Sequence, residues 1–197
     1  MPGRAALVLS GMLVFSGCAE RDLWPAERLD PQTAVNITSM TEQWIYSRDV
    51  PMLAANVRDY LSLGVVETNR AGARTYWLGV ITWSTIDRSM LAEPASRAKQ
   101  ISVRLKLPDN SLELQIVPGG RREIGASGTI FAAPQPVYED AWYRLGEAQL
   151  SRLAKSPPAT VSLVMDDGAV TAYEAWQVNR RALEEFLQAT GFTPGDP

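Results

Sequence analysis

Histidine is absent from all 197 residues of this chain, and cysteine occurs only once, at Cys18. Without histidine the chain cannot form a Ser-His-Asp triad, a Cys-His dyad or a histidine-ligated zinc site. A single cysteine also excludes an internal disulfide. The remaining chemistry comes from carboxylates, tyrosine, arginine, and serine combined with one of only three lysines. These absences favour a noncatalytic protein, and we expect neither a cofactor nor a bound metal.

The composition indicates a folded domain that does not bind nucleic acid. Hydrophobic residues make up 46% of the sequence and charged residues 21%, which is ordinary for a globular protein. The formal net charge is -3, so the chain lacks the positive field that attracts phosphate backbones. We therefore predict one globular domain and no nucleic-acid partner.

The first 18 residues, MPGRAALVLSGMLVFSGC, have the order of an export signal. A single positive charge at Arg4 precedes an apolar run from Ala5 to Phe15, and two small residues follow before Cys18. A charged segment, an apolar segment and a small-residue cleavage site in this order direct a chain to export. The apolar run is far shorter than the roughly 20 residues of a membrane-spanning helix. We therefore do not interpret it as a retained transmembrane segment, nor as a buried core helix.

The residues Phe15-Ser16-Gly17-Cys18 resemble the lipobox of bacterial lipoproteins, although that family usually has leucine or another aliphatic residue at the position of Phe15. The resemblance implies cleavage before Cys18 and attachment of a diacylglycerol to its thiol. It also implies sorting to the outer membrane, on its periplasmic face, because Ala19 and not aspartate follows the cysteine. The alternative is ordinary secretory cleavage after Ala19, since Gly17 and Ala19 also fit an A-x-A-type site.

These signals divide the chain into three parts. Residues 1–17 are the expected signal peptide, residues 18–32 a lipid-anchored tether, and residues 33–197 a single domain. The tether is polar and contains two prolines, which favour an extended conformation. Trp24 lies within the tether, and an aromatic residue so close to a lipid anchor could contact the membrane interface or a partner.

Three pairs of segments in the domain have the pattern of β-hairpins. They are 60–68 with 75–86, 101–107 with 112–116, and 160–165 with 169–177. The middle pair alternates apolar and polar side chains, which predicts half-buried strands with one wet face. Apolar residues occupy both faces of 75–86, which predicts a strand covered on both sides. Residues 41–48 and 129–132 are further candidate strands.

Two segments are expected to be helical. Residues 139–155 begin with Glu139 and Asp140 and end with basic residues, a charge order that complements the helix dipole. Asn179 is the expected N-cap of a final helix that ends at Gly191. This order of hairpins and helices predicts an α+β fold, with a largely antiparallel sheet built from hairpins and two helices packed on one face.

The tryptophans in the predicted elements are expected to lie in the core. In particular, we expect the third hairpin to pack beneath the apolar stripe of the final helix. The residues that form this contact in the prediction are Val161, Leu163 and Trp176 on the hairpin and Leu183, Phe186 and Leu187 on the helix.

Few polar residues form a pattern with chemical meaning. Arg121 and Arg122 follow two glycines and could hold an acidic group, so with Trp24 they are the candidate ligand or partner surface. Residues 96–99 resemble the S-x-x-K pattern of penicillin-binding proteins, but the companion K-T-G sequence is missing. The paired acidic residues are adjacent in sequence, whereas a glycosidase needs two carboxyl groups that face one another across a cleft.

Nothing after Cys18 identifies a substrate or a partner. We expect a cell-envelope lipoprotein whose noncatalytic domain binds or scaffolds a protein or peptidoglycan component of the envelope. The alternative is an envelope hydrolase that acts on peptidoglycan through carboxylates. That alternative requires two facing carboxyl groups in a cleft, one of them with a raised pKa.

Overall fold

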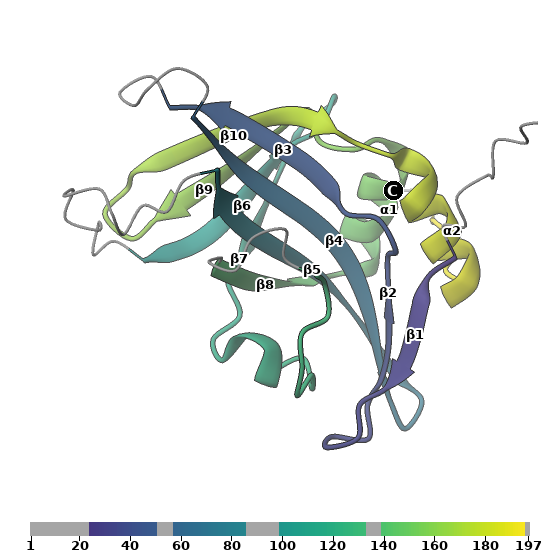
Figure 1. Cartoon of the computed structure of the whole chain (residues 1–197). Helices are drawn as coiled ribbons and strands as arrows, with labels where there is room; N and C mark the ends of the chain where they lie inside the picture. The colour runs from purple at the N-terminus through teal and green to yellow at the C-terminus, as the bar shows by residue number, and fades with distance from the viewer. Residues whose placement is uncertain (1–23, 51–56, 86–98, 133–138, 196–197) are drawn as a thin grey trace, which may run out of the picture.

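The computed structural model describes residues 24–50, 57–85, 99–132 and 139–195. These residues contain ten strands, two α-helices and one 3₁₀ turn (Figure 1). The elements are β1 (Ala26–Leu29), β2 (Asn36–Ser39), β3 (Trp44–Asp49), β4 (Arg58–Arg70), β5 (Ala73–Ser84), β6 (Gln100–Lys106), β7 (Ser111–Gln115), η2 (Gly120–Arg122), β8 (Glu139–Leu145), α1 (Glu147–Lys155), β9 (Thr160–Met165), β10 (Val170–Gln177) and α2 (Arg180–Thr190).

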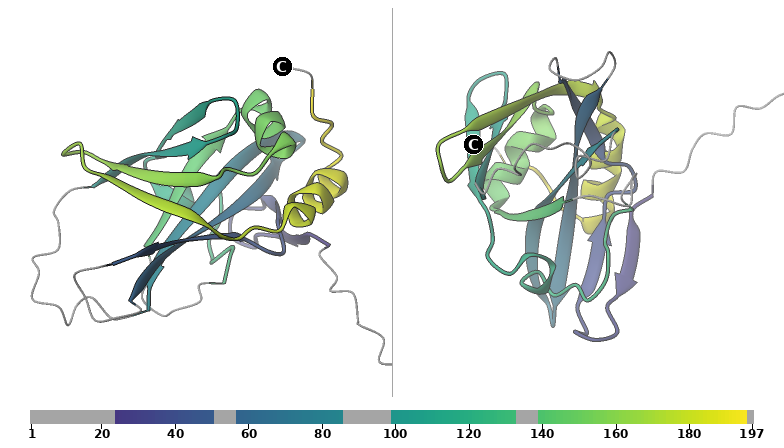
Figure 2. Two further views of the ribbon diagram at one scale, coloured as in Figure 1. Left: turned by 90° about the horizontal axis from the view of Figure 1, so that it is seen from above. Right: turned by 60° about the vertical axis from the view of Figure 1, so that its left-hand side comes forward.

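The strands form one antiparallel sheet that curls until β7 lies against β8 (Figure 2). Its main path runs β1-β2-β4-β3-β10-β9-β6-β7, and β5 joins β4 to β8. A single bridge between Ile116 and Tyr143 then brings the end of β7 against β8. Beside it, the Val117 N–H donates to the Trp142 carbonyl at 2.7 Å. Strands β3 to β10 therefore form a closed circuit, which we call the curled sheet, and the predicted antiparallel sheet is confirmed.

Every second residue of the strands fills the interior of the curled sheet. On β4 the inward residues are Leu61 and Leu63, and on β6 they are Val103 and Leu105; all four are at most 1% exposed. The intervening Arg104 is exposed. The sequence of 101–107 predicts this alternation, which arises because successive side chains of a strand point to opposite faces. The prediction is wrong at its first two residues: Ile101 is 40% exposed and Ser102 is buried, where the register of β6 against β9 shifts.

A second apolar cluster lies on the outside of the curled sheet. It consists of Val35, Ile37, Val66, Trp77, Ile81, Ile124, Ala126, Phe131 and Trp142. Three of these residues belong to residues 117–132, which we call the covering segment because they bury the outer wall formed by β2, β4, β5 and β8. Trp77 and Ile81 of β5 lie in this cluster while Leu78 and Val80 face the interior. The prediction that 75–86 is covered on both sides is therefore confirmed for residues 76–81, whereas residues 82–84 are only half-buried.

Two glycines allow the covering segment to approach the sheet closely. Gly64 and Gly79 are opposite each other on β4 and β5. A Cβ atom on Gly64 would lie 2.3 Å from the Phe131 ring, and one on Gly79 would lie 2.8 Å from the Trp142 indole. The Phe131 and Trp142 rings are nearly parallel, with centroids 6.2 Å apart. Glycine within these strands is thus required by the rings that cover them.

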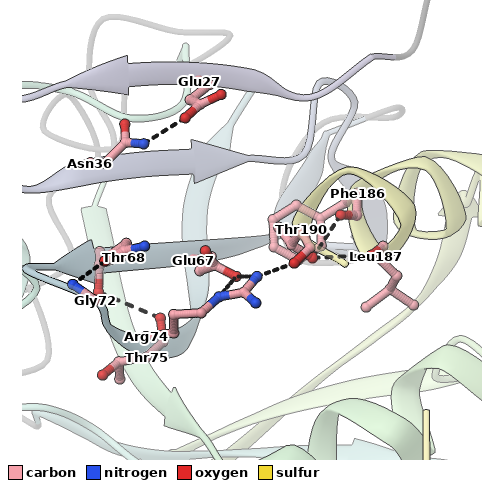
Figure 3. Close-up of polar contacts among 11 residues, drawn as sticks. Glu27, Asn36, Glu67, Thr68, Gly72, Arg74, Thr75, Phe186, Leu187 and Thr190 are labelled. Atoms are coloured by element: carbon pink, nitrogen blue, oxygen red, sulfur yellow. Dashed lines mark hydrogen bonds and ion pairs between the residues drawn. The ribbon is translucent and has the colours of Figure 1, made fainter. Parts of the chain in front are cut away.

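The final helix has the caps that its sequence predicts. The Asn179 side chain accepts a hydrogen bond from the Arg181 N–H at 3.1 Å, and Gly191 adopts a left-handed conformation with φ of 63° at the other end. Figure 3 shows Arg74 of β5 between the Glu67 carboxylate and the Thr190 carbonyl, to both of which it donates hydrogen bonds. Arg74 therefore links the β4–β5 hairpin to the C-terminal end of α2, where a cation is favourable.

The helix predicted over 139–155 is wrong in its first half. Residues Glu139–Leu145 form β8, and the helix α1 begins only at Glu147, after Gly146. In β8 the consecutive residues Ala141, Trp142 and Tyr143 are all buried, because both faces of the strand are covered. Tertiary pairing with β5 outweighs the local charge pattern that favoured a helix.

Two further expectations about the second half of the chain need correction. Val161 and Leu163 join Leu183, Phe186 and Leu187 in the interior cluster, as predicted. Trp176 does not: it is 50% exposed on the outside of β10. Tyr173 faces the interior, and Trp176 lies three residues further along the same strand, so the alternation of side chains places Trp176 on the outer face. The short strand expected over 129–132 is also absent, since these residues form bends and irregular structure.

The predicted tether contains a strand of the sheet. β1 pairs with β2 in antiparallel register, Ala26 with Ser39 and Leu29 with Asn36. Residues Ala26–Leu29, which are predicted from the sequence to belong to the tether, are therefore part of the sheet. All four residues of β1 are exposed, so the strand carries no apolar pattern by which its sequence could reveal it.

Candidate functional site

The strongest candidate surface is a row of stacked side chains on the outside of the curled sheet. It consists of Arg58, Tyr60, Trp83 and Trp176, and we call it the aromatic strip. The Tyr60 and Trp83 rings stack with centroids 4.2 Å apart and planes 11° apart. The Arg58 guanidinium lies over the Trp176 ring, 4.6 Å from its centroid. Cations over indole faces at this distance attract the ring electrostatically.

The register of the sheet assembles the aromatic strip from distant parts of the chain. Tyr60 of β4 is opposite Trp83 of β5, and both point outward because their neighbours Leu61 and Thr82 belong to the inward set. Arg58 precedes Tyr60 by two residues and therefore shares its face. Trp176 of β10 is also on the outer face, and its ring lies against the Arg58 guanidinium. No local sequence motif predicts this grouping, because the four residues come from three separate strands.

Polar side chains around the strip hold its members in place. The Arg58 Nε donates to the Asp49 carboxylate at 2.8 Å, and this hydrogen bond raises the pKa of Arg58. The Trp83 Nε1 donates to the Ser62 hydroxyl at 3.3 Å. Arg58 thus stays charged, and the indole of Trp83 is fixed against the sheet. Such an arrangement of rings and a guanidinium can bind planar or ring-shaped groups.

The residues predicted as a ligand surface lie elsewhere. Trp24 is 57% exposed just before β1, and its carbonyl accepts a hydrogen bond from the Thr41 hydroxyl. Arg121 forms an ion pair with Asp140 at 3.0 Å and also donates to Thr129, so it joins the covering segment to β8. Arg122 is exposed in η2. The structure does not bring these three residues together or join them to the aromatic strip.

Two other predicted features fall partly or wholly outside the described residues. Cys18, the expected lipid attachment site, lies outside them, and so does Ser96 of the S-x-x-K pattern. The Lys99 of that pattern is described, and its backbone N–H donates to the Asp166 carboxylate at 2.9 Å. No helix within the described ranges is long and apolar enough to cross a membrane.

Asp30 is an important buried carboxylate that the sequence reasoning missed. Its two oxygens accept hydrogen bonds from the backbone N–H groups of Gln32, Thr33 and Ser127 and from the Ser127 hydroxyl, at 2.7 to 3.1 Å. These bonds, chiefly the one from the Ser127 N–H, lower the pKa of Asp30 well below its ordinary value. Asp30 thereby joins the end of β1 to the covering segment. Its position before a proline, typical of a turn, was the available sequence signal.

Two depressions in the described surface bear on catalysis. One, of about 10 Å³, lies beside Arg121 and Asp140 and has room for about one water molecule. The other, of about 260 Å³, lies between α1 and the residues that follow α2 and contains Glu147, Arg152 and Lys155. Each depression presents one carboxylate. Among the described residues, no three acidic or cysteine side chains gather as metal ligands.

No family model, curated protein or solved structure matches this chain. The functional argument therefore depends on the geometry of the aromatic strip and on the N-terminal sequence.

Proposed function

We propose that this protein is a lipid-anchored component of the bacterial cell envelope whose noncatalytic domain binds another envelope component through the aromatic strip. The expected anchor is Cys18, on the periplasmic face of the outer membrane. The expected occupant of the strip is a protein or a peptidoglycan segment. The observation that carries the binding part of this proposal is the outward stacking of Arg58, Tyr60, Trp83 and Trp176 on the outside of the curled sheet.

The exposure of Trp176 supports a binding role for the strip. Burial of a tryptophan ring contributes a large hydrophobic free energy. The Trp176 ring, which is 50% exposed, gains only part of this free energy unless a partner covers the rest. Tryptophan, tyrosine and arginine are also the residues that most often dominate binding interfaces. Because three strands hold the strip, its side chains lose little conformational freedom when a partner binds.

The position of the two helices bears on which side of the curled sheet is open to a partner. We propose that both helices pack on the concave face of the sheet, and the support is that buried residues of each helix join the interior cluster. These residues are Leu150 and Leu153 of α1 and Leu183, Phe186 and Leu187 of α2. The part of the outside of the curled sheet that carries the strip is then left for a partner.

The alternative of a peptidoglycan hydrolase has less support. A carboxylate mechanism uses two acids about 5 to 9.5 Å apart on opposite sides of the substrate. Each of the two depressions described above offers one carboxylate, and Asp140 is already paired with Arg121. The observations in hand therefore favour binding over hydrolysis.

The test of the binding proposal compares strip variants with a matched control. Trp176→Ser and Trp83→Ser remove strip residues, while Val170→Ser removes a residue of β10 that is also exposed but lies outside the strip. Each acylated protein is incubated with purified peptidoglycan and, separately, with detergent-solubilised envelope proteins. We expect retention of one of these components by the parent and by Val170→Ser, and its loss in both strip variants. Equal retention by all four proteins contradicts a role for the strip.

A further inference from the structure

The most exposed large apolar side chains of the described residues gather at the beginning of the described chain. Leu29 is 66% exposed and Trp24 is 57% exposed, more than Val170, Trp176 or Ile101. Trp24 stands two residues before β1, and Leu29 is the last residue of that strand. An exposed leucine alone needs no explanation, but two large apolar residues within six positions at one sheet edge mark a surface that meets something apolar.

The fold fixes this edge to the rest of the domain. Between Trp24 and β1, Pro25 is buried, and the Trp24 carbonyl accepts a hydrogen bond from the Thr41 hydroxyl. At the other end of β1, the Asp30 carboxylate binds the Ser127 N–H and hydroxyl. Because both ends of β1 are held by hydrogen bonds, a surface that binds Trp24 and Leu29 also sets the orientation of the whole domain.

The length of chain before Trp24 limits what that surface can be. Only five residues separate Cys18 from Trp24. An extended chain spans at most about 3.5 Å per residue, so six steps reach about 21 Å. A lipid chain on Cys18 would therefore hold Trp24 within about 21 Å of the membrane surface, which is less than the width of a small domain.

We propose that the β1 edge docks on the membrane interface, with Trp24, before the strand begins, at the level of the lipid headgroups and Leu29, at the other end of the strand, in contact with the bilayer. This proposal rests on the acylation of Cys18. Tryptophan prefers the interface because its ring is apolar while its N–H remains hydrogen-bonded. Arg28, which is exposed on the same strand, can approach anionic headgroups. The nearby Glu27 carboxylate instead accepts a hydrogen bond from the Asn36 amide at 2.5 Å.

Docking at β1 places the aromatic strip away from the membrane. β2, which pairs with β1, is hydrogen-bonded to residues 66–69 near the end of β4, whereas Arg58 and Tyr60 stand at its beginning. Leu29 is level with Asn69, eleven residues of strand or about 36 Å from Arg58, whereas Trp24 lies before the other end of β1 and so nearer to the beginning of β4. The Leu29 end of the β1 edge and the strip are thus at opposite ends of β4, so one molecule can engage both the bilayer and a partner.

The experiment measures how strongly the tryptophans of the acylated full mature protein are quenched by bromine atoms in lipid acyl chains. The protein is reconstituted into vesicles of phosphatidylethanolamine and phosphatidylglycerol, with brominated or ordinary chains. Trp24→Phe removes the proposed interfacial ring, and Trp176→Phe is the matched control, because Trp176 is similarly exposed on the outer wall. Leu29→Ser tests the second contact, with Val170→Ser as its control.

We expect bromine quenching in the parent, its loss in Trp24→Phe and its retention in Trp176→Phe. Leu29→Ser should weaken the quenching, and Val170→Ser should leave it unchanged. Quenching that is equal in Trp24→Phe and the parent, for a protein whose mass proves acylation and which stays on the vesicles, overturns the docking proposal alone. A mass showing an unmodified Cys18 overturns both the docking and the lipid anchor, so the two failures are distinguishable.

Discussion

The two outer walls of the curled sheet differ in what covers them, although the strands of both walls share one interior. On the covered wall, outward residues such as Trp77 and Ile81 are buried beneath the covering segment. On the open wall, formed by β6, β7, β9 and β10, outward residues such as Arg104, Glu113 and Glu174 are exposed. The pattern of apolar residues along a strand therefore depends on what covers each of its faces. The central part of β5 is covered on both faces and has apolar residues on both, whereas β6 is covered on one face and alternates.

The aromatic strip lies where these walls meet. Trp83 packs against the cluster under the covering segment, whereas Trp176 projects from the open wall. Stability and binding are thus expected to separate most clearly at Trp176: substitutions in the interior and beneath the covering segment should unfold the protein, while a substitution of Trp176 should change binding alone. The following variants test this separation in order of expected effect.

The largest effect is expected in the interior, which both walls share. Phe186 is completely buried in the interior cluster, and Phe186→Ala should reduce the free energy of unfolding by roughly 3 to 5 kcal/mol, through lost burial and a new cavity. Denaturant unfolding measures the change, with Val170→Ala on the open wall as the control. A loss of less than about 1 kcal/mol, as for a surface substitution, would show that α2 does not belong to the core.

The covered wall should tolerate no side chain at its paired glycines. A Cβ on Gly64 would overlap the Phe131 ring, so Gly64→Ala should cost roughly 1 to 3 kcal/mol of stability through overpacking. Phe131→Ala removes the ring that is in the way, and the double variant should be more stable than the sum of the two single effects predicts. Strict additivity in a double-mutant cycle would show that the covering segment does not lie on Gly64.

Two Arg–Glu pairs allow a direct comparison between a protected and an open position. Arg74 pairs with Glu67, whose side chain is nearly buried, whereas Arg104 pairs with Glu113 and both of these side chains are exposed to solvent. Arg74→Ala leaves a buried carboxylate without its donor and should cost about 1 to 3 kcal/mol. Arg104→Ala should cost between about 0 and 1 kcal/mol. Equal losses in thermal unfolding would contradict the distinction between the two positions.

The smallest expected change in stability comes from the hydrogen bonds between Asp30 and the covering segment, and this change depends on pH. The folded state lowers the pKa of Asp30 below its ordinary 3.8, so the ionised carboxylate stabilises the fold at every pH above that value. This contribution is lost as the pH falls from 3.8 through the lower folded pKa. The parent should therefore lose its advantage over Asp30→Asn below pH 3.8 and keep it at neutral pH. A constant difference in unfolding midpoint across this range would exclude the mechanism.

The sequence predicted the stretches of strand whose environment is uniform. β6 alternates from Val103 onward and β7 along its whole length because one face is wet, and the central run 76–81 of β5 is apolar because both faces are covered. The caps at Asn179 and Gly191 are local and were also readable. The strand β8 was missed because its charged first residues imitate a helix start, and only pairing with β5 decides its structure.

The candidate site was less accessible to sequence reasoning. Tyr60 and Trp83 meet only through the register of β4 and β5, and Trp176 meets Arg58 only through the pairing of β10 with β3 and of β3 with β4. Register depends on tertiary pairing that single-sequence periodicity does not contain. Trp24 was singled out because of its distance from Cys18 in the sequence, and the structure adds that it stands exposed beside a strand fixed to the domain.

The most direct test of the proposed function is the mass of the N-terminal peptide from protein extracted with detergent from membranes. Acylation predicts a peptide that begins at Cys18 and carries a diacylglyceryl thioether and an N-acyl group, since stable anchoring requires more than one acyl chain. The Cys18→Ser variant should lose this lipid and either leave the membrane or remain uncleaved, while the fold of the domain is kept. An unmodified peptide beginning at Glu20 would establish ordinary secretion, and an intact Met1 in the cytoplasmic fraction would contradict export altogether.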